Sequence, residues 1–142
     1  EKNTLVFDYS RYEVISFLNS SAVFWAEKYH IDGLRLDNIA AMLYLDYNKA
    51  GKESAKNQFG GKENLEAVAF IQNLNIGIHE RFPNIMTFAE ESTAWPMISK
   101  PVDQGGLGFD FKWNMGWAND MFEYLATDSV YRRYKHEKLT FQ

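Results

Sequence analysis

The stretch that decides the fold is YHIDGLRLDN, residues 29–38. It predicts the end of an amphipathic helix, a turn at Asp32-Gly33 and a very short apolar strand that ends on a carboxylate. Because side chains alternate along a strand, Arg35 and Asp37 are expected on one face and the two leucines on the other. A charged carboxylate at the end of a buried strand is where α/β proteins place their chemistry. A structural ion pair between Arg35 and Asp37 is the alternative.

The composition is ordinary for a soluble globular domain, except for its aromatic content. The 142 residues suffice for one domain with a real core, with 46% hydrophobic and 24% charged residues. The net charge of -4 and the pI near 5.4 argue against binding nucleic acid or an anionic membrane. The sequence has no apolar run that could cross a bilayer and no cysteine, which fits a cytoplasmic protein. The 16% of aromatic residues could fill a core or form flat platforms for sugars.

Periodicity and turn signals predict helices that alternate with strands. A capping box at Ser10 opens a helix that runs to about Tyr29, and a second helix runs from about Glu63 to Arg81. The other expected elements are an extended entry at 4–9, a short helix or structured loop at 38–47, a surface loop at 49–62, strands at 84–91 and 109–113, an irregular stretch at 92–108, a helix at 117–126 and a basic, aromatic tail at 131–142. This order indicates βαβ units and a parallel sheet.

Each long helix has an apolar stripe with a spacing of three and four residues. In the first helix the stripe consists of Val14, Phe17, Leu18, Ala22, Trp25 and Tyr29. In the second helix it consists of Ala67, Ile71, Leu74 and Ile78. We expect both stripes to face the core.

Two successive predicted strands end in carboxylates, Asp37 and Glu90. Neighbouring strands lie roughly 4.8 Å apart, so acids at the same level would lie about 5 Å apart, near the separation in a retaining glycosidase. In that chemistry one carboxylate, here kept ionised by Arg35, attacks the anomeric carbon while the other protonates the leaving oxygen. Acids at strand ends are common, so the spacing alone leaves a structural role open.

Three motifs carry a resemblance to a known family. The run GLRLDNIAAMLYLDY at 33–47 resembles the second conserved region of the α-amylase superfamily, in the version of bacterial 1,4-α-glucan branching enzymes. TFAEEST at 87–93 resembles the third conserved region, and GFDFKWNMGW at 108–117 is similar to a further branching-enzyme segment. The resemblance covers essentially the whole chain, with the motifs in the family's order.

The resemblance implies roles for three residues. Asp37 matches the catalytic nucleophile, Glu90 the general acid/base and Arg35 the arginine that hydrogen-bonds the nucleophile. Glu91 has no such match; because it is one residue later on a strand, it is expected to face away from Glu90 in a structural role. The implied fold is α/β, with residues 1–142 as the middle of a (β/α)₈ barrel, from about its third helix to its sixth. The implied substrate is an α-glucan, whose α-1,4 linkage is cleaved and whose segment passes to a 6-hydroxyl to form an α-1,6 branch.

Two conserved regions of the superfamily would fall outside the chain. The first would precede Glu1, and the fourth, with the third catalytic carboxylate, would follow Gln142. We therefore expect the chain to be inactive by itself and to self-associate through exposed barrel edges. A noncatalytic glucan-binding piece of the same barrel and a hydrolase or trehalose-type enzyme of the superfamily are the alternatives.

Aromatic residues near the predicted strand ends are candidates for substrate binding. Trp95 and Trp113 could stack on glucose rings and Tyr44 could line the cleft, although packing is as plausible for each. Packing is favoured for Trp117, because it opens a helix.

The chain offers no recognisable metal or cofactor motif. The histidines share no metal-ligand spacing; they are His30, His79 and His136. The lysines of the polar loop fit a solvated surface; they are Lys49, Lys52, Lys56 and Lys62. We assign no metal ligand and no cofactor.

Overall fold

The structure is a computed structural model that describes residues 5–47 and 55–140. It divides into two compact units, Glu1–Lys112 and Trp113–Gln142. Thr4 of the expected extended entry and residues 49–54 of the expected polar loop, including Lys49 and Lys52, lie outside the described residues. Among the helices that the structure describes, none has the length and apolar character needed to cross a membrane.

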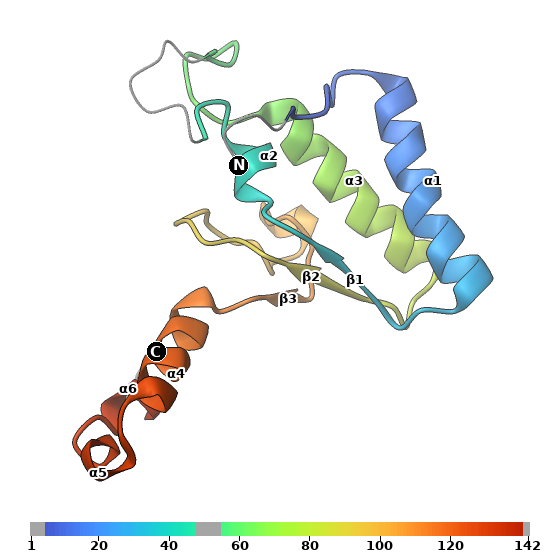
Figure 1. Cartoon of the computed structure of the whole chain (residues 1–142). Coiled ribbons are helices and arrows are strands. Elements are labelled where there is room, and N and C mark those ends of the chain that lie inside the picture. Colours follow the sequence, from blue (N-terminus) through green and yellow to red (C-terminus); the bar gives the residue numbers. More distant parts are fainter. Residues whose placement is uncertain (1–4, 48–54, 141–142) are drawn as a thin grey trace. The chain divides into compact units, whose positions relative to one another are not determined.

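A small parallel sheet organises the first unit (Figure 1). Its strands are β1 (Gly33–Leu36), β2 (Met86–Ala89) and β3 (Phe111–Lys112), which lie side by side in chain order. Leu36 pairs with Ala89, and Ala89 pairs with Lys112. The expected α/β class with a parallel sheet is confirmed, although β2 and β3 are shorter than predicted. Just before β3, the Asp110 amide donates to the Thr87 carbonyl at 3.1 Å and the Phe109 amide donates to the Ile98 carbonyl at 3.3 Å.

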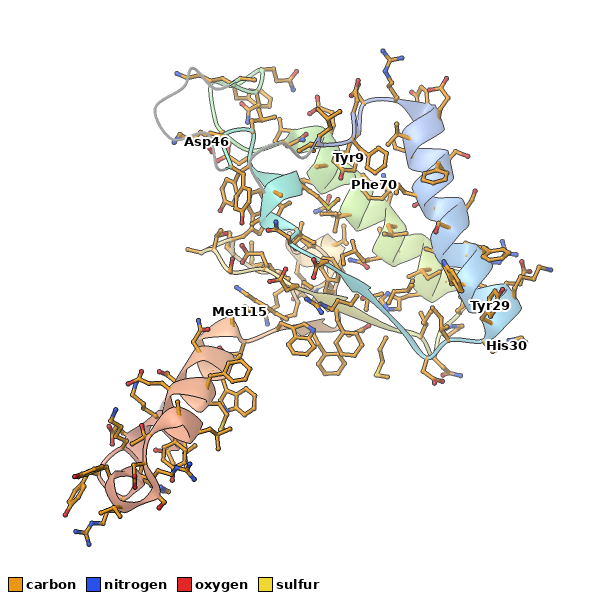
Figure 2. All side chains as sticks on the ribbon, in the orientation of Figure 1. Tyr9, Tyr29, His30, Asp46, Phe70 and Met115 are labelled. Atoms are coloured by element: carbon orange, nitrogen blue, oxygen red, sulfur yellow. The ribbon has the colours of Figure 1, made fainter. Side chains whose placement is uncertain are left out.

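Two long helices, α1 (Tyr12–Tyr29) and α3 (Leu65–Arg81), lie side by side against the sheet (Figure 1). The apolar stripe predicted for α3 is confirmed, because all four of its members are buried. At the start of the unit, the ring of Tyr9 stacks on that of Phe70 from α3 at 5.3 Å (Figure 2). Burying a large apolar side chain contributes about 1.5–3 kcal/mol, so this stripe fixes α3 on the sheet.

The stripe predicted for α1 is only partly right. Phe17, Trp25 and Tyr29 are 64%, 45% and 61% exposed, whereas the small Ala22 and Ala26 are buried. Small side chains let a helix lie close to its neighbours, so α1 packs through its alanines and leaves its bulky rings outside. Trp25 and Tyr29 contact each other instead, with ring centroids 4.7 Å apart.

The predicted capping box at Ser10 is wrong. The hydroxyl and the amide of Ser10 both donate to Oδ1 of Asp8, at 2.6 and 3.1 Å. The helix begins later, at Tyr12, and its N-cap residue Arg11 makes no side-chain cap. A local Asx turn has therefore taken the hydroxyl that the capping box would use.

A short helix, α2 (Ala40–Leu43), follows β1. It agrees with the short helix expected at 38–47, and its residues Ala40 and Leu43 are fully buried. Beyond it, Lys62 forms an ion pair with Asp46 at 2.6 Å, so this lysine does more than solvate the surface. The hydrogen bond to the Asp46 carboxylate, together with its charge, raises the pKa of Lys62.

The connection from β2 to β3 contains one short 3-10 helix, η1 (Val102–Gln104), and is otherwise irregular, as predicted. Two side chains of α3 hold it: Gln72 donates to the Gly106 carbonyl and Asn75 to the Leu107 carbonyl, both at 2.8 Å. A Cβ atom at Gly106 would lie 2.0 Å from the Lys100 carbonyl oxygen, so the backbone approaches itself there as only glycine permits.

The second unit is helical, with α4 (Met115–Ala126), α5 (Ser129–Arg132) and α6 (Glu137–Thr140). Asn114 caps α4 by accepting a hydrogen bond from the Trp117 amide at 2.9 Å. The described part of the basic, aromatic tail at 131–142 forms helical turns. Lys138 ties α6 to α4 through ion pairs with Asp120 at 3.2 Å and Glu123 at 2.6 Å.

Candidate active site

Asp37 and Glu90 each follow the last residue of a neighbouring parallel strand. Because Leu36 pairs with Ala89, the next residue of each strand lies at the same level. The backbone continues this pairing: the Glu90 amide donates to the Leu36 carbonyl at 2.9 Å, and the Ile39 amide donates to the Glu90 carbonyl at 3.0 Å. The carboxyl ends of β1 and β2 therefore present two acids at one edge of the sheet.

Arg35 lies beside the first acid. Its Nη2 donates to Oδ1 of Asp37 at 2.5 Å, as expected for two residues on one face of a strand. The side chains are 47% and 76% exposed. An ion pair as open as this one adds little to stability, which weakens the purely structural alternative. It does orient the carboxylate and leave it accessible.

Asn38 connects the two acids through its backbone. It adopts a left-handed conformation with φ 48, which Asn tolerates better than most residues. In this turn the Asn38 amide donates to Oε2 of Glu90. The main chain that carries Asp37 thus also holds the carboxyl group of Glu90, and both groups belong to one local arrangement.

The open face of the sheet below these acids is aromatic. Phe88 of β2 and Phe111 of β3 are paired in the register, and their rings stack at 5.1 Å. Arg35 is paired with Phe88 in the same row, and Phe111 is 50% exposed. Arg35 and Phe88 of this row lie two residues before Asp37 and Glu90 along β1 and β2.

Glu91 lies in a different environment from Glu90. Its side chain is 0% exposed and forms an ion pair with Lys112 of β3 at 3.0 Å. Its other oxygen accepts from the Thr93 amide at 2.6 Å and from the Thr93 hydroxyl. The expectation that Glu91 is structural agrees with this burial.

The aromatic candidates fall into two groups. Tyr44 and Trp95 are half-buried, pack against the core and contact each other edge-on at 5.2 Å, with the Tyr44 oxygen 3.4 Å from Oγ1 of Thr93. The structure thus brings these two together next to the acids' strand ends, from the segments after β1 and β2. Trp113 opens the second unit, and its role as a binding residue stays a prediction.

Sequence reasoning missed Lys112 and Thr93. A lysine inside an otherwise aromatic strand segment, between Phe111 and Trp113, was a usable signal, because a charged residue there needs a partner. The identity of that partner, Glu91, depends on how β3 is placed beside β2, which the local sequence does not contain.

One further polar cluster lies at the opposite end of the sheet. Oδ2 of Asp110 accepts from the Thr87 amide at 2.7 Å and contacts Nε2 of His79 at 3.0 Å. Burial alone would raise the pKa of Asp110, but the Thr87 hydrogen bond together with His79 holds it below its usual value. Within the described ranges, no three His, Cys, Asp or Glu side chains group as metal ligands would.

No family model matches the chain. Among curated proteins, however, it is 58% identical over 139 residues to the 1,4-alpha-glucan branching enzyme GlgB of Aquifex aeolicus, covering 98% of this chain and 22% of that protein. The chain is related to the 1,4-alpha-glucan branching enzymes. The relative from Thiobacillus denitrificans is 55% identical over 138 residues, covering 97% of this chain and 19% of its own length. The relative from Chlamydia pneumoniae is 56% identical over 139 residues, covering 98% and 19%.

The resemblance to branching enzymes is therefore confirmed. The chain spans about a fifth of the length of these relatives. It corresponds to one segment of a branching enzyme, and that segment contains Asp37, Glu90 and Arg35.

Proposed function

We propose that this chain supplies two catalytic carboxylates of a 1,4-α-glucan branching enzyme. The observation that carries the proposal is the pairing of Leu36 with Ala89, which puts Asp37 and Glu90 at one level on adjacent parallel strands. Adjacent strands lie roughly 4.8 Å apart, and a retaining glycosidase needs carboxyl groups about 5–5.5 Å apart. The relatives are 1,4-alpha-glucan branching enzymes, and their name supplies the substrate class, an α-1,4-glucan.

The reaction then proceeds in two displacements. A carboxylate oxygen of Asp37 attacks the anomeric carbon while the Glu90 carboxyl gives its proton to the leaving 4-oxygen, so the α-1,4 bond breaks and a glycosyl ester forms. Glu90, now a carboxylate, takes the proton from a 6-hydroxyl of the acceptor glucan. That oxygen attacks the anomeric carbon, and Asp37 leaves as a carboxylate, which completes an α-1,6 branch.

We also propose roles for the other residues of the site. Arg35 holds the Asp37 carboxylate in place through its hydrogen bond. Tyr44 and Trp95 form a half-buried aromatic pair on the neighbouring segments and contribute a wall for a glucose ring. Trp113 contributes a further stacking surface.

The fold of the parent protein is proposed to be a (β/α)₈ barrel, with this chain as a middle part. The support is topological. The three strands are parallel and adjacent in chain order, and α1 and α3 lie on the same face of the sheet (Figure 1). Barrels keep their helices on one side of consecutive strands, and their active sites lie at the carboxyl ends of those strands.

The test is to replace the matching segment of the Aquifex aeolicus relative with this chain and to assay the graft on amylose. We expect α-1,6 linkages, detected by NMR. Asp37→Asn and Glu90→Gln should each lower the rate by at least about 10³-fold. Glu80→Gln, a matched change on the exposed surface of α3, should leave the rate unchanged. New reducing ends without α-1,6 linkages would instead indicate a hydrolase, and full activity of Asp37→Asn would refute the proposal.

The chain by itself is proposed to be inactive and self-associated. In the described part of the chain, β1 and β3 are the edge strands of a small open sheet, and Phe111 of β3 is 50% exposed. Such edges pair with other chains. Branching of amylose by the purified chain would contradict the first expectation, and a concentration-independent monomer in light scattering would contradict the second.

A further inference from the structure

The segment that follows β2 contacts the ammonium group of Lys112 at two oxygen atoms. Nζ of Lys112 lies 3.0 Å from Oε2 of Glu91 and 3.4 Å from the Thr93 carbonyl oxygen. Glu91 is fully buried while Lys112 is 37% exposed at its side chain. A buried carboxylate needs a charged partner, so Lys112 fixes the path of residues 91–93.

Thr93 extends this contact to the segment after β1. The Thr93 hydroxyl bonds Oε1 of Glu91 and lies 3.4 Å from the Tyr44 oxygen. A carboxylate can only accept, so the Thr93 proton points to Glu91 and the Tyr44 hydroxyl is the donor to Thr93. The network thus joins β3 to both segments that surround the acids.

Glu90 lies between this network and β1. On the β1 side it is held by three hydrogen bonds: to the Leu36 carbonyl, from the Ile39 amide and from the Asn38 amide. On the other side its neighbour Glu91 is held by Lys112. The position of Glu90 therefore depends on contacts to both flanking strands.

We propose that Lys112 is a positioning residue for Glu90, acting through Glu91 and Thr93. This rests on the proposed role of Glu90 as acid/base. An apolar pair could fill the same volume at no loss of stability, but it would not direct the turn at 91–93. The ion pair between Lys112 and Glu91 instead holds residues 91–93, after β2, in one backbone conformation.

The first test needs no enzymatic activity. In the full 142-residue chain, amide hydrogen exchange is compared between the original protein and Lys112→Met. The amides of Asn38 and Ile39, which donate to Glu90, should exchange about tenfold faster. The Met86 amide, which donates to the Asp32 carbonyl at the far end of the same strand pair, should change less than about twofold.

Two controls separate positioning from general stability. Arg81→Met removes an exposed ion pair with Glu27 between α1 and α3 and should leave the Asn38 and Ile39 amides unchanged. The double variant Glu91→Gln/Lys112→Met leaves no unpaired buried charge, so it should regain the thermal midpoint but keep the fast exchange. If Lys112→Met does not fold, the double variant alone gives this comparison. Uniformly faster exchange, or full recovery of slow exchange in the double variant, would overturn the proposal.

A second readout uses the graft into the Aquifex aeolicus relative. There Lys112→Met should lower kcat about tenfold with KM nearly unchanged, and Lys112→Arg should restore most of kcat, because the catalytic acid is misplaced while the substrate surface is intact. An unchanged kcat for Lys112→Met would overturn the proposal. Failure of the proposed function shows separately, as branching that survives Glu90→Gln.

Discussion

Different interactions stabilise the interior of each of the two units of this chain. Within the described residues, every buried side chain belongs to the first unit, and none belongs to α4, α5 or α6. The second unit relies on ion pairs of Lys135 and Lys138 and on hydrogen bonds from Arg132 to the Thr127 and Leu125 carbonyls. Apolar packing tolerates salt, whereas exposed ion pairs are screened by it. The candidate acids lie on the unit whose geometry packing has fixed.

The largest expected effect comes from opening the core of the first unit. Ile71→Ala, at a fully buried position of α3, should lower the free energy of unfolding by about 3–4 kcal/mol, because it leaves a cavity. Urea denaturation followed by circular dichroism measures it. Phe122→Ala in α4, where the ring is 69% exposed, is the matched control and should change stability by less than about 0.5 kcal/mol. Equal effects would contradict the difference between the units.

The next largest effect concerns how the β2–β3 connection lies on α3. Gly106→Ala should lower the free energy of unfolding by about 2 kcal/mol, since the new methyl would meet the Lys100 carbonyl oxygen at 2.0 Å. Gly77→Ala is the control: its Cβ would meet nothing within 4 Å on the α3 helix, so it should stabilise by about 0.5–1 kcal/mol. Opposite signs in thermal melts are the expected result, and a neutral Gly106→Ala would show that the connection can shift.

Acid should weaken the first unit through Asp110. The pKa of Asp110 is lower in the folded protein, so its contribution is present above the pKa of the unfolded chain and is lost as pH falls through the folded pKa. The stability difference between the original chain and Asp110→Asn should therefore shrink as the pH falls from 5 to 3, a range that includes the unfolded pKa of about 3.9. Asp103→Asn, on the exposed η1, should show no such trend. A constant Asp110→Asn difference would contradict the assignment.

The smallest effect is expected in the second unit. Lys138→Met removes the ion pairs to Asp120 and Glu123, and the pKa of Glu123 is lowered chiefly by its hydrogen bond from Lys138. The amides of α6 should exchange faster while those of α3 stay the same. In the original chain, 1 M salt should have a similar effect, because the Debye length is then about 3 Å. Lys100→Met, on the exposed surface of the first unit, is the control, and salt-insensitive α6 amides would contradict this account.

The sequence predicted the parts of this structure that are encoded locally. The four apolar positions of α3 and the alternation around Arg35 and Asp37 follow from the geometry of a helix and of a strand, and the structure has both. The motifs also predicted the relation to branching enzymes. Whether Asp37 and Glu90 act on a glucan is a chemical prediction that the graft experiment decides.

The predictions that were wrong or missing concern residues whose partners lie far away in the sequence, or residues that fit more than one local pattern. Ser10 satisfies two patterns, and the turn with Asp8 was preferred to the helix cap. On α1, periodicity cannot tell which of several apolar sides meets the core, so Trp25 and Tyr29 were placed wrongly. The Lys112–Glu91 pair joins residues 21 positions apart through the order of strands, which no local pattern records.

The contact between Tyr44 and Trp95 has a practical consequence for spectroscopy. Trp25, Trp113 and Trp117 are each about half exposed, at 45%, 46% and 45%, whereas Trp95 is enclosed more fully beside Tyr44. Replacing the three exposed tryptophans with phenylalanine would leave a single indole as the emitter, with a phenol 5.2 Å away as an energy donor. The fluorescence of that variant would report directly on the strand ends that carry the acids.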